Sequence, residues 1–284
     1  MVSNAVIISW YTILISIVTF PLMIAILMRV KYKTKFSPFL LGLLVYFSFG
    51  VFATSVVNTL FISENRPTYS FLTGNVVTYS LYFAVVTGIM EMLGLFVAYK
   101  KILVNYDEKE TSITLALGHA EMEGLMVCFL ALAAYISWAT VLNERGPAGF
   151  AEYFADVEGL NIEEAIDSIT SVTVSEVVLL ALQRVIYLGM NIFLSVMIFY
   201  AAKKDIRSYF WVAVVFRGLC TVPGSVERYN ELKDVRGNSA LLTAFLAVVV
   251  AMLGYMSIKL YKAYDAGKIL YPADLFKKHP DPHF

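Results

Sequence analysis

The chain alternates between long apolar runs and short polar segments. Seven apolar runs lie near residues 5–29, 37–62, 73–99, 112–142, 176–202, 209–222 and 239–260. An apolar helix of about 20 residues spans a bilayer, because it rises about 1.5 Å per residue and the hydrocarbon core is about 30 Å thick. The apolar residues are continuous rather than alternating, which favours helices over barrel strands. The pattern predicts an all-α membrane protein, a polytopic bundle of about seven transmembrane helices.

The sixth run is the shortest. It has only about 14 residues, contains Arg217 and ends at Pro223-Gly224, so it is either a span or a re-entrant or buried element. A span is favoured, because removing it would place the basic C-terminal tail outside.

Basic residues indicate which side of the membrane each end of a run faces. From the N-terminus to the tail, the flanks of the runs hold none, four, one, three, one, three, three and five Lys or Arg residues. Basic residues concentrate on the cytoplasmic side, so we expect an outer N-terminus and a cytoplasmic C-terminus. The first run has no basic residues ahead of it and no cleavage pattern, so we expect a retained span rather than a signal peptide.

The longest loop, 143–175, is acidic, with seven acids and a single base. We expect it on the outer side. Within it, Asn161 and Glu164 have the spacing of a capping box, and helical spacing continues at Ile162, Ile166 and Ile169. This pattern predicts a short amphipathic helix on the bilayer surface. The helix is either a packing lid over the bundle or a lip that gathers substrate.

The composition agrees with a membrane protein. Of 284 residues, 59% are apolar and 15% are charged, and the mean hydropathy is +0.70. Soluble domains typically have about 45–50% apolar and about 25% charged residues. Basic and acidic residues number 22 each, and no basic block is long enough to contact a phosphate backbone along its length. Nucleic acid is therefore not an expected partner. We expect one integral membrane domain, residues 1–284, with the outer loop 143–175 and a cytoplasmic tail, 261–284. The expected location is a cell membrane, the cytoplasmic membrane of a prokaryote.

A few ionisable residues lie inside the apolar runs. Each costs roughly 2.5–3.5 kcal/mol there, so those that remain indicate a function or a partner. They are Glu91, His119, Glu121, Glu123, Arg184 and Arg217. His119 and Glu123 are four residues apart and share a helix face, whereas Glu121 points away.

The positions of three of the polar residues suggest one site. Measured from the cytoplasmic flanks, Glu91 lies about 13 Å deep, His119 about 10 Å and Asn191 about 17 Å. Arg184, Asn191 and Ser195 line one stripe of the fifth run. Three consecutive antiparallel helices therefore place a carboxylate, an imidazole and an amide at similar depths in the cytoplasmic half.

Such a site is suited to hydrolysis. Glu91 and His119 can activate a water molecule, and Asn191 and Ser195, one turn apart, offer hydrogen-bond donors to a developing oxyanion.

The other charged residues have alternative, structural roles. Glu123 and Arg184 either support the site or pair to hold helices together. For Arg217, a role as counter-ion or a snorkelling position is favoured over catalysis.

Zinc is an alternative that the residues do not favour. A zinc ion takes three or four ligands, usually from His, Cys and carboxylates. The runs hold one His, the other two are His279 and His283 in the tail, and there is no His-Glu-x-x-His pattern. Cys128 and Cys220 do not complete a ligand set. We expect no cofactor, with zinc as the alternative.

Three short segments carry a family pattern. They read GIMEMLGL at 88–95, GHAEME at 118–123 and NIFLS at 191–195. They resemble the YhfC family, in the superfamily of polytopic intramembrane proteases with the CAAX prenyl proteases, PrsW and the Aph-1 subunit of gamma-secretase. The family shows Glu-Glu followed by Arg, then Gly-His with Glu four residues after the His, then His with a polar residue one turn later.

The resemblance implies a role for each matching residue. Glu91 would be the catalytic base and His119 its partner on the nucleophilic water, with Asn191 and Ser195 at the oxyanion position.

Three residues depart from the pattern. Met92 replaces the second Glu, Leu95 stands where the Arg is expected, and Asn191 replaces the third-segment His. Without that Arg, Glu91 would lack a counter-ion, and Asn cannot supply the acidity of an imidazole.

We predict an intramembrane endopeptidase of the glutamic type that acts on a membrane-associated peptide or protein. One alternative is a catalytically inactive scaffold or chaperone of the same fold that binds hydrophobic partner segments, which the departures favour. The other is a small ion-coupled transporter, against which the lack of an inverted repeat counts.

Overall fold

The structure is a computed structural model, and it describes residues 1–157, 160–233 and 237–275. In these ranges every regular element is a helix, and seven helices are long and apolar enough to cross a membrane. They are α1 (Asn4–Tyr32), Ser37–Phe61, Val76–Ile102, Glu110–Tyr153, α9 (Val174–Lys204), α10 (Arg207–Leu232) and α11 (Ser239–Asp265). The predicted all-α, polytopic bundle of about seven spans is confirmed.

Three spans are built from successive helical pieces. The second consists of α2 (Ser37–Val45), the π-helix η1 (Tyr46–Ala53) and α3 (Thr54–Phe61). The third joins α5 (Val76–Val97) to the π-helix η2 (Ala98–Ile102), and the fourth joins α6 (Glu110–Gly124), the π-helix η3 (Leu125–Phe129) and α7 (Leu130–Tyr153). Short π-helical segments often occur at functional sites. The remaining elements are α4 (Tyr69–Leu72), α8 (Ile162–Thr170) and the 3-10 helix η4 (Pro272–Asp274).

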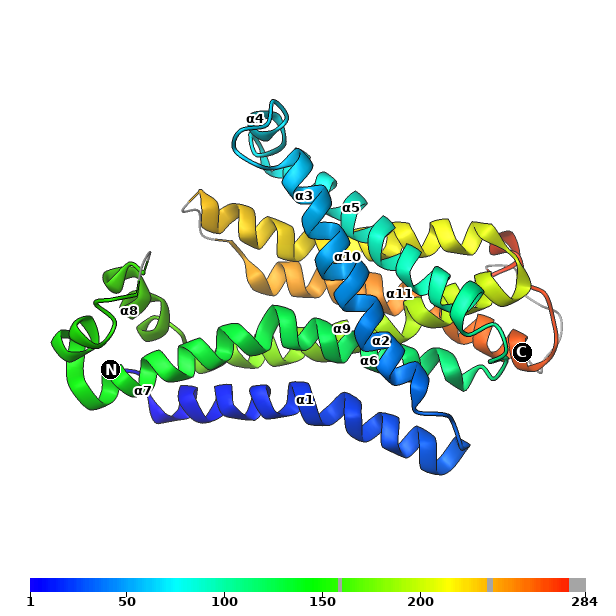
Figure 1. Cartoon of the computed structure of the whole chain (residues 1–284), viewed down its shortest axis with the longest axis horizontal. Helices are drawn as coiled ribbons and strands as arrows, with labels where there is room; N and C mark the ends of the chain where they lie inside the picture. The colour runs from blue at the N-terminus through cyan, green and yellow to red at the C-terminus, as the bar shows by residue number, and fades with distance from the viewer. Residues whose placement is uncertain (158–159, 234–236, 276–284) are drawn as a thin grey trace.

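Helix α9 forms the centre of the bundle. It is the most buried of the seven spans and packs against α1, α5, α6, α10 and α11 (Figure 1). One apolar core joins α5, α9, α10 and α11, and a second joins α1, α7, α8 and the start of α9. Figure 1 shows the N-terminus at the end of the bundle that holds α8, whereas α11 ends at the opposite end. Which end is cytoplasmic stays a prediction.

The sixth span is longer than the sequence predicts. The expected end at Pro223-Gly224 is wrong, because α10 continues through Pro223 to Leu232. Proline removes a backbone hydrogen bond from a helix, and side-chain hydroxyls bond nearby carbonyls. Tyr187 donates to the carbonyl of Cys220 at 3.4 Å, and Ser225 donates to the carbonyl three residues before it at 2.8 Å. α10 nevertheless continues to Leu232 and has the length of a full span.

The acidic loop starts later than residue 143. α7 stays helical to the residue before Gly146, where φ is 71°, and then forms a second helical stretch to Tyr153. Glycine readily adopts this left-handed conformation. The predicted short helix is present as α8, and the Asn161 side chain accepts a bond from the Glu164 backbone at 3.3 Å. Glu158, and the tail residues 276–284 with His279 and His283, lie outside the described residues.

The contacts of α8 fit a packing lid. Ile169 is fully buried in the second apolar core, with Trp10 of α1 and Phe150 of α7. The lid alternative is therefore favoured over a substrate-gathering lip.

Candidate functional site

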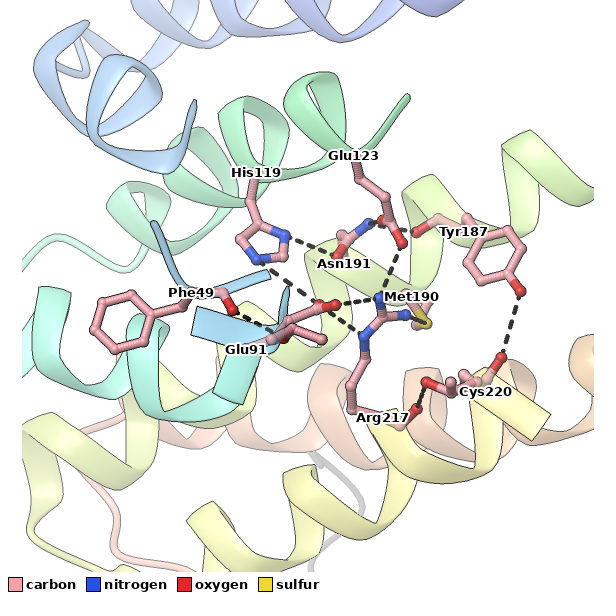
Figure 2. A network of polar contacts seen from close by, with 11 residues as sticks. Phe49, Glu91, His119, Glu123, Tyr187, Met190, Asn191, Arg217 and Cys220 are labelled. Carbon is pink, nitrogen blue, oxygen red and sulfur yellow. Dashed lines mark hydrogen bonds and ion pairs between the residues drawn. The ribbon is translucent and has the colours of Figure 1, made fainter. Parts of the chain in front are cut away.

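Four polar side chains from three helices meet inside the bundle. Glu91 comes from α5, His119 and Glu123 from α6, and Asn191 from α9 (Figure 2). None of them is more than 6% exposed. The structure therefore brings these predicted residues together in one buried network.

A close helix crossing sets the position of His119. Gly118 on α6 faces the backbone carbonyl of Phe39 on α2, and Gly42 on α2 faces the backbone of Leu115 and His119. A side chain at either glycine would overlap these backbone atoms. Small residues let membrane helices approach closely, so the two glycines fix how α6 lies against α2.

Arg217 of α10 holds both carboxylates of the network. Its Nε and Nη2 donate to the two oxygens of Glu91 at 2.7 and 2.6 Å, and Nη2 also donates to Glu123 Oε1 at 2.9 Å. Paired bonds between a guanidinium and a carboxylate are among the stronger polar contacts in proteins. The predicted counter-ion role of Arg217 is confirmed. The expectation that Glu91 lacks a counter-ion is wrong, because α10 supplies the charge that Leu95 does not.

Asn191 links Glu123 to His119. Its Nδ2 donates to Glu123 Oε2 at 2.5 Å and to the backbone carbonyl of Tyr187 at 3.1 Å. These two acceptors assign the amide orientation, which leaves Oδ1 facing Nδ1 of His119 at 3.1 Å. An amide oxygen only accepts, so Nδ1 carries the proton and Nε2 of His119 is the accepting nitrogen.

Two hydrogen-bond acceptors consequently face each other. Nε2 of His119 lies 3.9 Å from Oε2 of Glu91, which is too long for a direct hydrogen bond. Nε2 is buried and has no partner in the part of the chain that the structure describes, an uncommon state for a buried polar atom. One water molecule donating to both atoms would satisfy them. The Glu91 and His119 pair is thus suited to hold a nucleophilic water.

The two residues predicted at the oxyanion position are engaged elsewhere. The Ser195 hydroxyl donates to the carbonyl of Ser112 at 2.8 Å and lies 2.5 Å from the hydroxyl of Tyr99. Both Nδ2 hydrogens of Asn191 are also used. In the structure Ser195 hydrogen-bonds neighbouring helices and Asn191 orients His119, and their contacts with an oxyanion stay a prediction.

Arg184 lies outside the network, beside a cavity. Its guanidinium is 5.0 Å from the ring centroid of Tyr187, and its Nε has no partner among the residues described. The cavity measures about 330 Å³, lies between α1, α6 and α9, and is mostly apolar. Glu123, Asn191 and Arg184 line it, whereas Glu91 and His119 do not. The cavity approaches the network from its Asn191 side.

Tyr46 also lies in this region, although the sequence pattern does not single it out. It is the first residue of η1, it is 5% exposed, and its ring meets the imidazole of His119 edge-on with centroids 5.0 Å apart. An aromatic residue within an apolar run has no pattern that separates it from its neighbours. Only the packing of η1 on α6 reveals it.

The donor set does not fit a metal ion. Across the described ranges, no group of three or more His, Cys, Asp or Glu residues is placed to hold one. Nη2 of Arg217 donates to both Glu91 and Glu123, so a metal ion between these carboxylates would have to displace the guanidinium. The chain itself supplies the cation of this site.

Comparison with known proteins gives one family. No curated protein and no solved structure matches the chain significantly. Residues 13–235 match the family model described as YhfC intramembrane metalloprotease, a range that includes the whole network. The predicted family is thereby confirmed, and the chain, a multi-pass membrane protein, belongs to the YhfC family of intramembrane metalloproteases.

Proposed function

We propose that this protein is an intramembrane peptidase of the glutamic type, which hydrolyses a peptide bond with Glu91 and His119. One observation carries the proposal: the two acceptor atoms that face each other at 3.9 Å inside the bundle. Arg217 and Asn191 hold these two residues in place. Membership of a family of intramembrane proteases supports the same reaction class.

The side chains suffice for the hydrolytic step. Water donates one hydrogen to Oε2 of Glu91 and the other to Nε2 of His119, which leaves an oxygen lone pair for the carbonyl carbon. As the new C–O bond forms, Glu91 takes the proton, and it returns this proton to the amine nitrogen when the C–N bond breaks. Asn191 keeps His119 in the accepting tautomer throughout.

The family description implies a bound metal ion, which the residues of this chain do not fit. Arg217 takes the place between Glu91 and Glu123 that a cation would need. The proposed hydrolysis therefore uses side chains and water alone.

The cavity between α1, α6 and α9 supports a membrane-associated substrate. An extended apolar segment in lipid has backbone carbonyls without partners, and Arg184 offers a donor inside this apolar cavity. Glu91 and His119 do not line this cavity, so a substrate that enters it approaches them from the Asn191 side.

The experiment uses the purified full chain in proteoliposomes with fluorogenic peptides that carry an apolar segment of about 20 residues. We expect cleavage, identified by mass spectrometry, and a loss of about 10²-fold or more in Glu91→Gln and His119→Ala. Glu121→Gln is the matched control, because Glu121 is a buried α6 carboxylate outside the network. Full activity in both Glu91→Gln and His119→Ala would contradict the proposal.

Metal analysis separates the glutamic type from a metal-dependent one. We expect far less than one zinc ion per purified chain and no loss of cleavage with 1,10-phenanthroline. A stoichiometric metal ion whose removal abolishes cleavage, and whose return restores it, would overturn the glutamic assignment.

A non-catalytic scaffold is the second candidate, and one observation favours it: Arg217 already bonds both carboxylates. A scaffold of this kind would bind hydrophobic segments of partner proteins. Recovery of the same stable partner by the wild type and by Glu91→Gln, without cleavage products, would support this function over proteolysis.

A further inference from the structure

The proposed hydrolysis needs a donor that the predicted residues do not supply. When water attacks a peptide carbonyl, negative charge develops on the carbonyl oxygen, and donors aimed at it supply much of the rate enhancement. The amide hydrogens of Asn191 are used by Glu123 and Tyr187. The hydroxyl of Ser195 is used by Ser112.

A tyrosine donor lies beside the site, the hydroxyl of Tyr46, a residue that is 5% exposed. The Tyr46 ring packs edge-on against the imidazole of His119, with an interplanar angle of 86°. No hydrogen bond from its hydroxyl is found among the described residues, and this oxygen is not one of the fully enclosed polar atoms, so a ligand atom can reach it. Buried tyrosines usually have a hydrogen-bonded hydroxyl, so a hydroxyl without a bond on a ring that packs against His119 indicates a position where a ligand atom binds.

The charges around Tyr46 are those of the site. Its hydroxyl lies within electrostatic range of Glu91, Glu123 and Arg217. A phenol is a donor as well as an acceptor at neutral pH. The nearby carboxylates and His119 Nε2 are acceptors, so Tyr46 is the neutral donor on this side of the network.

The backbone of η1 makes room for the ring. A Cβ atom at Gly50 would lie 2.8 Å from two ring carbons of Tyr46, which is closer than a van der Waals contact allows. Gly50 therefore lets the ring lie across its own helix and against His119.

We infer that Tyr46 donates a hydrogen bond to the carbonyl oxygen of the scissile peptide bond as this oxygen becomes an oxyanion. This inference rests on the proposed function. The water oxygen bonds to the carbonyl carbon, the C=O electron pair moves onto the carbonyl oxygen, and the phenol O–H stabilises that charge until the C–N bond breaks. No proton leaves Tyr46.

The test compares Tyr46→Phe with Tyr79→Phe in the proteoliposome assay. Both tyrosines are buried, and Tyr79 is twelve residues from Glu91 on α5, about 18 Å along the helix. We expect kcat to fall about 10²–10³-fold in Tyr46→Phe, with KM within about twofold, and no change in Tyr79→Phe. A kcat for Tyr46→Phe within threefold of the wild type would overturn the inference.

A second variant covers the case in which Tyr46→Phe does not fold. Gly50→Ala displaces the Tyr46 ring and is expected to lower kcat in the same way, with KM retained. Unchanged kcat in a folded Gly50→Ala protein would count against the role of Tyr46.

Binding separates failure of this inference from failure of the proposed function. A phosphinic peptide carries a tetrahedral, anionic centre that mimics the intermediate and is not cleaved. We expect Tyr46→Phe to bind it at least tenfold more weakly than the wild type, while a matched amide peptide binds both equally. Equal affinity for the phosphinic peptide overturns the inference even if cleavage occurs. If the wild type cleaves no peptide but still binds the phosphinic peptide more tightly than Tyr46→Phe does, only the proposed peptidase function is overturned.

Discussion

Arg217 on α10 and Glu91 on α5 form a buried, bidentate ion pair across 126 residues of sequence. The same guanidinium bonds Glu123 on α6, so three helices meet at one charge. The pair fixes the orientation of the carboxylate that faces His119, and it connects the stability of the bundle to the geometry of the site.

Replacing Arg217 by Gln should destabilise the protein by about 3–5 kcal/mol, because it leaves two buried carboxylates without a cation. The stability of Arg217→Lys should lie between those of the wild type and Arg217→Gln, since an ammonium keeps the charge but cannot form the paired bonds. Thermal unfolding followed by fluorescence-detected size exclusion measures both. Arg228→Gln, an exposed residue of the same helix, is the control. Wild-type stability of Arg217→Gln would show that the ion pair is dispensable.

Filling the cavity should weaken substrate binding. Ser16 lines the cavity between α1, α6 and α9, so Ser16→Trp is expected to raise KM severalfold with little change in kcat, because it removes binding space without touching Glu91 or His119. Ile15→Trp adds the same side chain to a residue that is 57% exposed and does not line the cavity. Equal KM values for the two variants would argue for another route of access.

Replacing a glycine by alanine where α2 and α6 cross should destabilise the protein. Gly118→Ala is expected to lower stability by at least about 1–3 kcal/mol, because the added atom meets the backbone of Phe39, and to lower kcat by moving His119. Gly189→Ala is the control, since its Cβ would have an ordinary contact of 3.8 Å. The prediction fails if Gly118→Ala matches Gly189→Ala in thermal midpoint and kcat.

A surface ion pair between α9 and η2 should give a small pH dependence. Lys100 donates to Asp205 at 2.9 Å and lowers the pKa of that carboxyl. The stabilisation is therefore present above the unfolded pKa of about 3.9 and is lost as the pH falls through the lower folded value. The thermal midpoint of Asp205→Asn should lie below that of the wild type at pH 7 and converge with it under acidic conditions. A constant difference at all pH values would contradict this account.

The hydropathy pattern was enough to predict the fold, and the scarcity of charge within the spans was enough to point to the network. Glu91, His119 and Asn191 could be placed at similar depths because helices rise regularly. The pattern could not show which helix faces Arg217, because that depends on how α10 packs against α5. It also placed the end of α10 at Pro223, because proline commonly ends a helix, whereas α10 continues through it.

Tyr46 could not be predicted for a different reason. Its position depends on the π-helical turn of η1 and on the space at Gly50, and neither is visible in residue spacing. A π turn changes which side chains face the neighbouring helix, so a regular 3.6-residue count along this span gives the wrong face.

The position of Arg217 also bears on how the chain enters the bilayer during synthesis. α10 is the least apolar span, with a mean hydropathy of 1.3 against at least 2.0 for the other six, and a guanidinium near its middle opposes transfer into lipid. Its two carboxylate partners lie on α5 and α6, which leave the ribosome earlier. We expect α10 to pack directly onto these helices as it leaves the translocation machinery. The guanidinium and the two carboxylates would then pair in the same step that forms the site.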